Sequence, residues 1–336
     1  MYTRPGREVS EATLDLTLIS PVYNERESLP ILYEKLCAVL ERLDLTAEIV
    51  FVDDGSSDGS TQFLQELCEQ DERVVVAVQR RNFGKSAALT TGFALARGAR
   101  IVMLDADLQD EPEEIPRLLE KLDEGYDVVI GWKQSRQDPL TKRLPSKIAN
   151  GITAKVTGIR LHDMNSGLKA FNAACPKQLN LYGDMHRFIP ILAHNNGFRV
   201  TEIPVVHHPR QFGKTKYGPA RMLRGGFDFL TVLFLANFRY RPLHLFGLTG
   251  LTAIVIGLIV NVYLTIGWAL GDRPLSQRPL LLLGILLLLM GTQLLIMGLI
   301  GELFVFFAQR SEDPLHGTAV VYQVPADETQ PAKDQL

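Results

Sequence analysis

Two long stretches without a charged side chain most constrain the fold of this 336-residue chain. They cover residues 242–271 and 279–301. Each stretch exceeds the roughly 20 apolar residues needed to span a hydrocarbon core. A buried helix in a soluble protein is rarely apolar on all sides over such a length, which disfavours the alternative of two core helices. The sequence therefore predicts a transmembrane helical hairpin over residues 242–308.

The distribution of charge around this hairpin predicts its orientation. Residues 199–241 contain eight Lys or Arg and two acidic residues, whereas the link 271–279 contains two arginines and one aspartate. This excess of positive charge favours both ends of the hairpin in the cytoplasm, although the two arginines in the link weaken the preference. Residues 1–16 lack the apolar core of a signal peptide, so we expect a multi-pass protein of the cytoplasmic (inner) membrane with its catalytic domain in the cytoplasm. Three scattered cysteines without metal-ligand spacing fit a reducing compartment.

Before the hairpin, the first 135 residues alternate short runs rich in Val and Ile with longer amphipathic runs. This alternation predicts an α/β fold with a mainly parallel sheet and helices on both of its faces. The predicted strands are 14–20, 48–52, 74–78, 100–104, 127–131 and 198–207, and the predicted helices are 27–43, 60–69, 85–96, 113–124, 144–157 and 186–195. Sheets of this kind bind ligands beyond the carboxyl ends of their strands, and the polar motifs of this chain follow its apolar runs.

Composition predicts where the domains end. Residues 221–239 mix Phe and Leu with Arg, which is typical of an interfacial helix on the cytoplasmic leaflet. The polar segment after Arg310 is expected to be poorly ordered. The predicted organisation is a catalytic domain over 1–220, a juxtamembrane amphipathic helix over 221–241, the hairpin over 242–308 and a cytoplasmic tail over 309–336.

The sharpest chemical signal is the segment 105–110, DADLQD, after the fourth predicted strand. Because alternate residues of an extended segment point to the same side, Asp105, Asp107 and Gln109 could converge. Three oxygen-bearing side chains suit Mg²⁺ or Mn²⁺, which would bind a diphosphate as it leaves. The alternative is an ordinary acidic loop, and the position beside the acidic pair 53–54 favours the metal.

Other polar motifs occupy similar positions. PVYNE at 21–25 suits hydrogen bonds to a base, although a plain helix N-terminus fits equally well. The adjacent carboxylates in VDDGS at 52–56 are costly unless a ribose, a base or a metal compensates them, and capping of the next helix explains only one acidic residue of this cluster. RNFGK at 81–85 and RQFGKTKY at 210–217 could bind phosphate oxygens, and the second could equally bind anionic lipid.

Two classes of function lose support. The chain has neither the Gly-x-Gly-x-x-Gly pattern of dinucleotide-binding enzymes nor the Gly-x-x-x-x-Gly-Lys-Ser/Thr pattern of P-loop proteins. A net charge of -3 gives no argument for nucleic-acid binding.

Taken in order, PVYNE, VDDGS, RNFGK and DADLQD resemble glycosyltransferase family 2, and in particular dolichol-phosphate mannosyltransferases and bacterial polyprenyl-phosphate glycosyltransferases. The resemblance covers roughly residues 15–220. It implies a GT-A fold and an inverting, metal-dependent transfer of a sugar from a UDP- or GDP-sugar to undecaprenyl or dolichyl phosphate. It also implies a homo-oligomer.

The resemblance implies three groups of site residues. The nucleotide sugar would contact Pro21, Tyr23, Asn24, Glu25, Asp53, Asp54, Asn82, Lys85, Asp105, Ala106, Arg210 and Lys216. The metal would bind Asp105, Asp107 and Gln109, and Asp107 is also a catalytic candidate. The acceptor phosphate would contact Lys133, Arg136, Arg143, Ser146, Ser166 and Lys169.

The segment 163–169, DMNSGLK, departs from relatives that have Gly-Asp-Phe-Arg, in which the Asp is a proposed base. No Asp follows Gly167, so the base is not assigned by analogy and Asp163 is only a candidate. A phosphate acceptor is largely ionised near neutral pH, so a strong base is unnecessary. The chain also lacks the Gln-x-x-Arg-Trp motif of processive synthases, which favours a single transfer.

Three alternatives remain at this point: a catalytically silent membrane scaffold, a glycosyltransferase with another membrane acceptor, and a transporter. Two spans with Asn261, Gln293 and Glu302 as the strongly polar candidates make a poor transport pathway. The sequence leaves open the sugar, the choice between uracil and guanine, and the length of the lipid.

Overall fold

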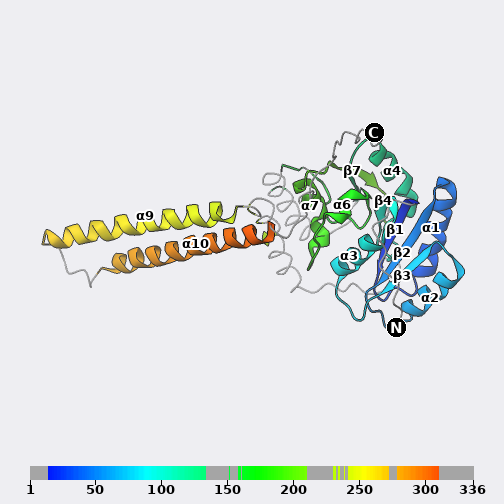
Figure 1. Cartoon of the computed structure of the whole chain (residues 1–336), viewed down its shortest axis with the longest axis horizontal. Coiled ribbons are helices and arrows are strands. Elements are labelled where there is room, and N and C mark those ends of the chain that lie inside the picture. The colour runs from blue at the N-terminus through cyan, green and yellow to red at the C-terminus, as the bar shows by residue number, and fades with distance from the viewer. Residues whose placement is uncertain are drawn as a thin grey trace, which may run out of the picture.

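The computed structural model describes residues 14–133, 161–209, 241–271 and 278–309, together with the single positions 151, 158, 159, 230, 231, 234 and 238. A seven-stranded sheet forms the centre of the globular part, in the order β3-β2-β1-β4-β6-β5-β7 (Figure 1). Its strands are β1 Leu14–Val22, β2 Ala47–Asp53, β3 Val74–Val78, β4 Gly98–Met103, β5 Val128–Lys133, β6 Lys169–Asn172 and β7 Val200–Val205. Only β6 pairs antiparallel with its two neighbours, β4 and β5, among these strands. The predicted mainly parallel α/β sheet is confirmed, and β6 is an addition that the sequence pattern did not indicate.

Helices cover both faces of the sheet (Figure 1). They are α1 Leu29–Leu43, α2 Ser60–Gln70, α3 Lys85–Leu95, α4 Ile115–Asp123, α6 Ala174–Lys177 and α7 Ile189–Asn195, with 3₁₀ turns η1 Pro112–Glu114 and η2 Met185–Phe188. Alternate residues of β1 face opposite cores, because Leu18 packs with the side chains of α1, α2 and α4 whereas Ile19 packs with those of α3 and α7. Burial of each such side chain stabilises the fold by about 1.5–3 kcal/mol.

The strand register brings the ends of the parallel strands to one edge of the sheet. Val22 at the end of β1 pairs with Asp53, and Asp53 pairs with Val78 at the end of β3. Lys133 at the end of β5 pairs with Val205 at the end of β7. The loops that follow these strands therefore lie along a single edge, where the sequence motifs are expected.

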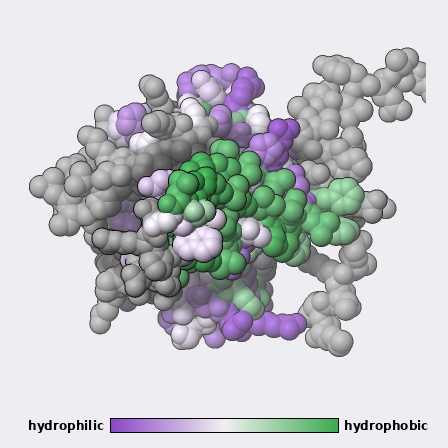
Figure 2. Space-filling model, turned by 90° about the vertical axis from the view of Figure 1, so that its left-hand side faces the viewer, coloured by the Kyte–Doolittle hydropathy of each residue, from purple (hydrophilic) through white to green (hydrophobic). Residues whose placement is uncertain are grey.

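Two apolar helices extend from the globular part, α9 Pro242–Ala269 and α10 Pro279–Gln309 (Figure 1). Both are long and apolar enough to cross a membrane, and only 17% and 11% of their most apolar windows are buried. Core helices of a soluble protein would be mostly buried, so this alternative loses its support. Figure 2 shows apolar side chains gathered over the hairpin.

Glycines let the two helices approach closely. A Cβ atom on Gly250 would lie 2.6 Å from the carbonyl oxygen of Gly291, and one on Gly257 would lie 2.8 Å from the carbonyl oxygen of Gly284. Small residues at helix contacts are typical of membrane helices.

Several predicted segments lie outside the described residues. They are the helix expected at 144–157 except for Gly151, most of the interfacial helix expected at 221–239, and the tail after Gln309. In the interfacial segment, Leu230, Thr231, Phe234 and Phe238 are helical, and the Phe234 ring lies 5.8 Å from the Phe246 ring of α9, centroid to centroid.

Candidate functional site

The loops after β1 and β2 form one continuous surface. Asn24 occupies the left-handed region with φ 54°, a conformation that Asn tolerates better than most residues. Its amide nitrogen donates to Ser56 Oγ at 2.9 Å, and its side-chain oxygen accepts from the Ser57 amide at 2.8 Å. The amide of Glu25 donates to Ser60 Oγ at 3.1 Å. Asn24 thus joins the two loops, and its predicted contact with a nucleotide sugar stays a prediction.

The adjacent carboxylates Asp53 and Asp54 are both buried, and the protein itself supplies their hydrogen-bond donors. Asp53 Oδ1 accepts from the Ser56 amide at 3.1 Å, and Asp53 Oδ2 accepts from the Thr61 hydroxyl. Asp54 accepts from the amides of Phe83 at 2.6 Å and Gly84 at 2.9 Å. Burial raises the pKa of Asp54, and these two amide hydrogen bonds oppose the shift. The cost of this acidic pair is therefore met inside the fold, and contact with a nucleoside remains a prediction.

The loop after β2 and the loop after β3 lie in direct contact, through the Asp54 hydrogen bonds and through a close approach of their backbones at Gly55. A Cβ atom on Gly55, which has φ 72°, would lie 2.7 Å from the carbonyl carbon of Arg81. Only a glycine at this position permits the close approach of the two backbones. The loop 81–84 is thereby fixed above the start of α3.

Lys85, at the start of α3, forms a hydrogen-bonded ion pair with Asp105 after β4. Their side chains are 28% and 30% exposed, so the pair lies at the surface of the site. Burial alone would raise the pKa of Asp105, but the charge and hydrogen bond of Lys85, with Lys133 and Lys169 further away, lower it to about 2. Asp105 is therefore an anion at every physiological pH. Two of the predicted donor-site residues are brought together here.

The chain turns at residues 106–108, with Leu108 at φ 58°. The prediction assumed an extended chain, so the alternation argument does not apply to these residues. Gln109 donates from its amide nitrogen to Asp107 Oδ1 at 3.3 Å and from Nε2 to the His208 carbonyl at 3.5 Å. Within the described residues, no three Asp, Glu, His or Cys side chains gather as a metal site. Two carboxylates and one amide remain the candidate ligands, and their convergence stays a prediction.

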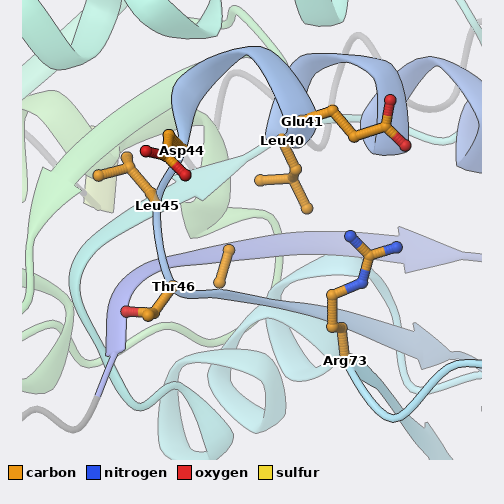
Figure 3. A pocket seen from close by; sticks show the side chains of 7 residues that line it. Leu40, Glu41, Asp44, Leu45, Thr46 and Arg73 are labelled. Atoms are coloured by element: carbon orange, nitrogen blue, oxygen red, sulfur yellow. The ribbon is translucent and has the colours of Figure 1, made fainter.

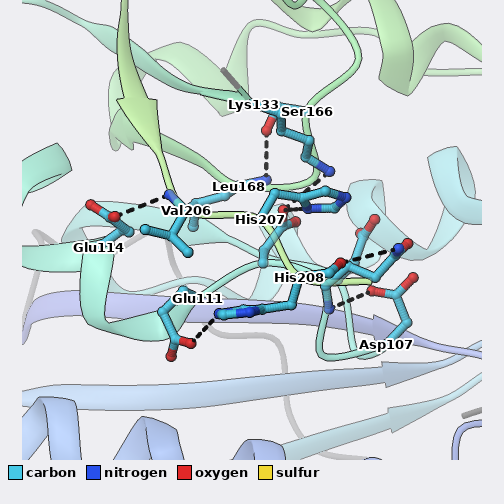
Figure 4. Close-up of polar contacts among 12 residues, drawn as sticks. Asp107, Glu111, Glu114, Lys133, Ser166, Leu168, Val206, His207 and His208 are labelled. Atoms are coloured by element: carbon cyan, nitrogen blue, oxygen red, sulfur yellow. Dashed lines mark hydrogen bonds and ion pairs between the residues drawn. The ribbon is translucent and has the colours of Figure 1, made fainter. Parts of the chain in front are cut away.

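The segment after β7 runs beside the acidic motif (Figure 4). Asp110 and His207 form an isolated antiparallel bridge, and the His208 amide donates to the Gln109 carbonyl at 2.8 Å. Lys133 Nζ lies 3.2 Å from Asp110 Oδ1, and His208 Nε2 lies 2.9 Å from Glu111 Oε2. Sequence reasoning missed Asp110, Glu111, His207 and His208 as a group. The sequence shows two adjacent acidic residues and two adjacent histidines, but no spacing rule indicates that residues 97 positions apart are in contact.

The segment 163–169 lies beneath this surface. Lys169 is 1% exposed and donates to the Ser166 carbonyl, while Ser166 Oγ accepts from the Leu168 amide at 3.3 Å. Burial, together with the charge of Lys85, lowers the pKa of Lys169 to about 8. Asp163 is 3% exposed, and its Oδ1 accepts from the Asn165 amide at 3.1 Å. The proposed contacts of Ser166 and Lys169 with a lipid phosphate, and the role of Asp163 as a base, stay predictions.

The remaining predicted residues divide into two groups. Pro21 and Tyr23 are half-buried at the end of β1, Asn82 is exposed, and Ala106 is 3% exposed. Arg136, Arg143, Ser146, Arg210 and Lys216 lie outside the described residues.

A pocket on the globular part lies elsewhere (Figure 3). It is lined by Leu40, Glu41, Asp44, Leu45, Thr46, Ala47 and Arg73. Thr46 and Arg73 immediately precede β2 and β3, so this pocket is at the amino edge of the sheet, opposite the motif loops.

The chain is similar to known proteins over most of its length. Residues 17–177 match the family model described as glycosyl transferase family 2. Dodecaprenyl-phosphate galacturonate synthase of Rhizobium johnstonii is 34% identical over 296 residues, which cover 87% of this chain and 88% of the relative. Undecaprenyl-phosphate 4-deoxy-4-formamido-L-arabinose transferase of Salmonella paratyphi A is 37% identical over 289 residues, covering 85% and 87%.

A solved structure supports the fold. Glucosyl-3-phosphoglycerate synthase from Mycobacterium tuberculosis, in complex with Mn²⁺, uridine diphosphate and phosphoglyceric acid, has a TM-score of 0.53 and 16% identity, covering 70% of this chain and 84% of that chain. The predicted GT-A fold is confirmed, and the alternative of a silent scaffold loses its support because the curated relatives are named as synthases and transferases. The chain therefore belongs to glycosyl transferase family 2, as one of the polyprenyl-phosphate glycosyltransferases that its sequence motifs indicated.

Proposed function

We propose that this enzyme transfers a sugar from a UDP- or GDP-sugar to the phosphate of a polyprenyl lipid at the cytoplasmic leaflet. One observation carries the proposal: a sheet edge rich in carboxylates and lysines belongs to the same chain as a hairpin whose apolar surface is exposed. A water-soluble acceptor would not require such a hairpin. The names of the curated relatives, which state dodecaprenyl and undecaprenyl phosphate, support the same acceptor class.

Asp105, Asp107 and Gln109 fit a hard divalent cation, because they offer two carboxylates and an amide oxygen within five consecutive residues. The low pKa of Asp105 keeps its carboxylate ionised for this role. When bound, Mg²⁺ or Mn²⁺ would stabilise the negative charge of the diphosphate as it leaves. Lys85 brings a positive charge to the same place, and we assign Arg210 and Lys216 to the same diphosphate.

We assign Lys133, with Arg136, Arg143 and Ser146, to the acceptor phosphate. An oxygen of the lipid phosphate forms a bond to the anomeric carbon of the sugar while the bond from that carbon to the diphosphate breaks, with inversion. Because a phosphate monoester is largely ionised near neutral pH, orientation and charge stabilisation provide most of the acceleration. Nucleoside diphosphate is the second product.

We also propose the location and assembly of the enzyme. The hairpin crosses the inner membrane, with the catalytic domain 1–220 and the tail 309–336 in the cytoplasm and the helix 221–241 on the leaflet. The excess of Lys and Arg before the hairpin supports this orientation. We expect a homo-oligomer.

The test is a transfer assay with the full chain in membranes, undecaprenyl phosphate and a panel of UDP- and GDP-sugars, with and without Mn²⁺ or Mg²⁺. Asp107→Ala should abolish transfer while the protein stays folded and membrane-bound. Asp123→Ala, which removes an exposed carboxylate that pairs with Arg100, should leave transfer unchanged. Normal turnover by Asp107→Ala would refute the metal assignment. Transfer to another membrane lipid, but not to undecaprenyl phosphate, would identify the alternative acceptor class.

A further inference from the structure

Asp110 is the last residue of the acidic motif 105–110, and its side chain is more deeply buried than that of Asp105. Its side chain is 1% exposed. A buried carboxylate is costly unless charges or hydrogen bonds compensate it. Among the described residues, neither Asp110 oxygen accepts a hydrogen bond of good geometry. Its charge is compensated by the ammonium of Lys133, whose Nζ lies 3.2 Å from Oδ1, and the polar ring of His207 places Nδ1 3.5 Å from the same oxygen.

Lys133 occupies a defined position because of this contact. It is the last residue of β5, at the edge of the sheet that holds the motif loops, and its side chain is 12% exposed. A free lysine side chain loses rotamer entropy when its ammonium is ordered. The Asp110 carboxylate orders that ammonium before any substrate arrives, which reduces the entropic cost of binding an anion there.

Gly167 fixes Asp110 relative to the rest of the acidic motif. A Cβ atom at this position would lie 2.3 Å from Asp110 Oδ2 and 2.7 Å from Asp105 Oδ2. Both carboxylates therefore rest against the same glycine. Any shift of Asp110 would change the distance between Lys133 and the proposed donor-binding residues.

We infer that Asp110 is a positioning residue, which holds the Lys133 ammonium beside the motif 105–109 so that it receives the acceptor phosphate next to the donor. This inference rests on the proposed function, because it takes Lys133 as the contact with the lipid phosphate. Asp110 acts through Lys133 and touches neither substrate.

The test is a double-mutant cycle on the full chain with undecaprenyl phosphate and the donor found in the screen. Asp110→Asn should raise the KM for the lipid about tenfold, with little change in the KM for the donor. Lys133→Gln should have the same effect. In the Lys133→Gln background, Asp110→Asn should raise the lipid KM no further, because the group through which it acts is gone. Asp123→Asn is the matched control, since its carboxylate pairs with Arg100 away from the site.

Three results would overturn the inference: multiplying effects in the double variant, an equal rise in the donor KM, or an unchanged lipid KM in Asp110→Asn. If Asp110→Asn alone does not accumulate, the neutral pair Asp110→Asn/Lys133→Gln is compared with Lys133→Gln. Equal lipid KM values support the inference, and a higher value for the pair overturns it.

A second readout separates this inference from the proposed function. Acylation of Lys133 by an amine-reactive ester, followed by mass spectrometry, should be faster in Asp110→Asn than in the wild type. Lys121, which pairs with Glu124, should react equally in both. Failure of the wild type to transfer any sugar to polyprenyl phosphate would refute the proposed function, whereas unchanged labelling of Lys133 would overturn the role of Asp110.

Discussion

His208 Nε2 lies 2.9 Å from Glu111 Oε2, and Lys35 Nζ of α1 donates to Glu111 Oε1 at 2.8 Å. Glu111 thus joins α1 to the segment after β7, and Figure 4 shows its contact with His208 in that segment. Burial alone would raise the pKa of Glu111, but the hydrogen bonds and charges of Lys35 and His208 together lower it. The predicted basic loop starts two residues after His208 in the sequence, so we expect a change at Glu111 to affect that loop.

We expect Glu111→Gln to weaken binding of the nucleotide sugar by about three- to tenfold. The amide keeps the shape of the side chain but removes a charge-assisted bond worth about 1.5–3 kcal/mol, only part of which reaches the donor site. Calorimetry on the full chain in detergent would measure the donor Kd. Glu113→Gln is the control, because the Glu113 side chain is 65% exposed and makes a long contact of 3.6 Å with Arg42. Equal donor affinity in the two variants would contradict this expectation.

Gly167→Ala should lower the rate of transfer at least tenfold without unfolding the protein. The new methyl group would overlap Asp110 Oδ2 and Asp105 Oδ2, so at least one carboxylate must move. Turnover at saturating substrates would measure the effect. A Cβ atom on the helical Gly151 meets no atom of the described residues within 4 Å, so Gly151→Ala is the matched control. Wild-type turnover in Gly167→Ala would show that the position of the two carboxylates is unimportant.

His186 should make the fold sensitive to acid. Its Nδ1 lies 3.0 Å from Ser86 Oγ, and Ser86 Oγ accepts from the His186 amide at 3.1 Å. Burial, with the nearby charges of Lys85 and Arg187, lowers the pKa of His186 from 6.5 to about 2. Below pH 6.5 the unfolded chain binds a proton that the folded chain does not, so this contribution to stability is complete above pH 6.5 and is lost as the pH falls.

Between pH 6.5 and pH 5 the loss from His186 should be about 2 kcal/mol. Thermal unfolding in detergent at pH 7 and pH 5 would measure it. His186→Asn keeps a polar side chain beside the Ser86 hydroxyl and removes the titration, so its Tm should fall less over this interval than that of the wild type. Equal falls in Tm would argue against a buried neutral histidine.

Gly291→Ala should destabilise the hairpin by about 1–3 kcal/mol. Its methyl group would lie 2.6 Å from the Gly250 carbonyl oxygen on the facing helix, so α9 and α10 must separate. The SDS concentration at which the full chain unfolds would report the change. Gly247→Ala is the control, because in the part of the chain that the structure describes its Cβ would meet only Leu243 of the same helix. Similar midpoints for the two variants would indicate that the helices do not pack through Gly250 and Gly291.

Much of the architecture could be predicted from local sequence. The hairpin is predicted by two long segments without charged residues. A helix can span a membrane on its own apolar length, without contacts to distant residues. The parallel strands follow from short Val- and Ile-rich runs between amphipathic segments. β6 was missed because its four residues are too short to show a period and pair only with distant strands.

The sequence by itself determined the family motifs and their places after the strands, because composition and periodicity act over a few residues. It did not determine which groups pair with each charged side chain. The carboxylates Asp53 and Asp54, read as waiting for a ligand, are satisfied by Ser56, Thr61 and the amides of 83–84.

Only the tertiary structure decided that Asp110 meets Lys133 and His207, and that Lys169 is buried beneath them. These contacts join side chains from β5, β6 and the segments after β4 and β7. Because a buried charge takes its partners from whatever the fold places beside it, sequence spacing alone does not reveal them.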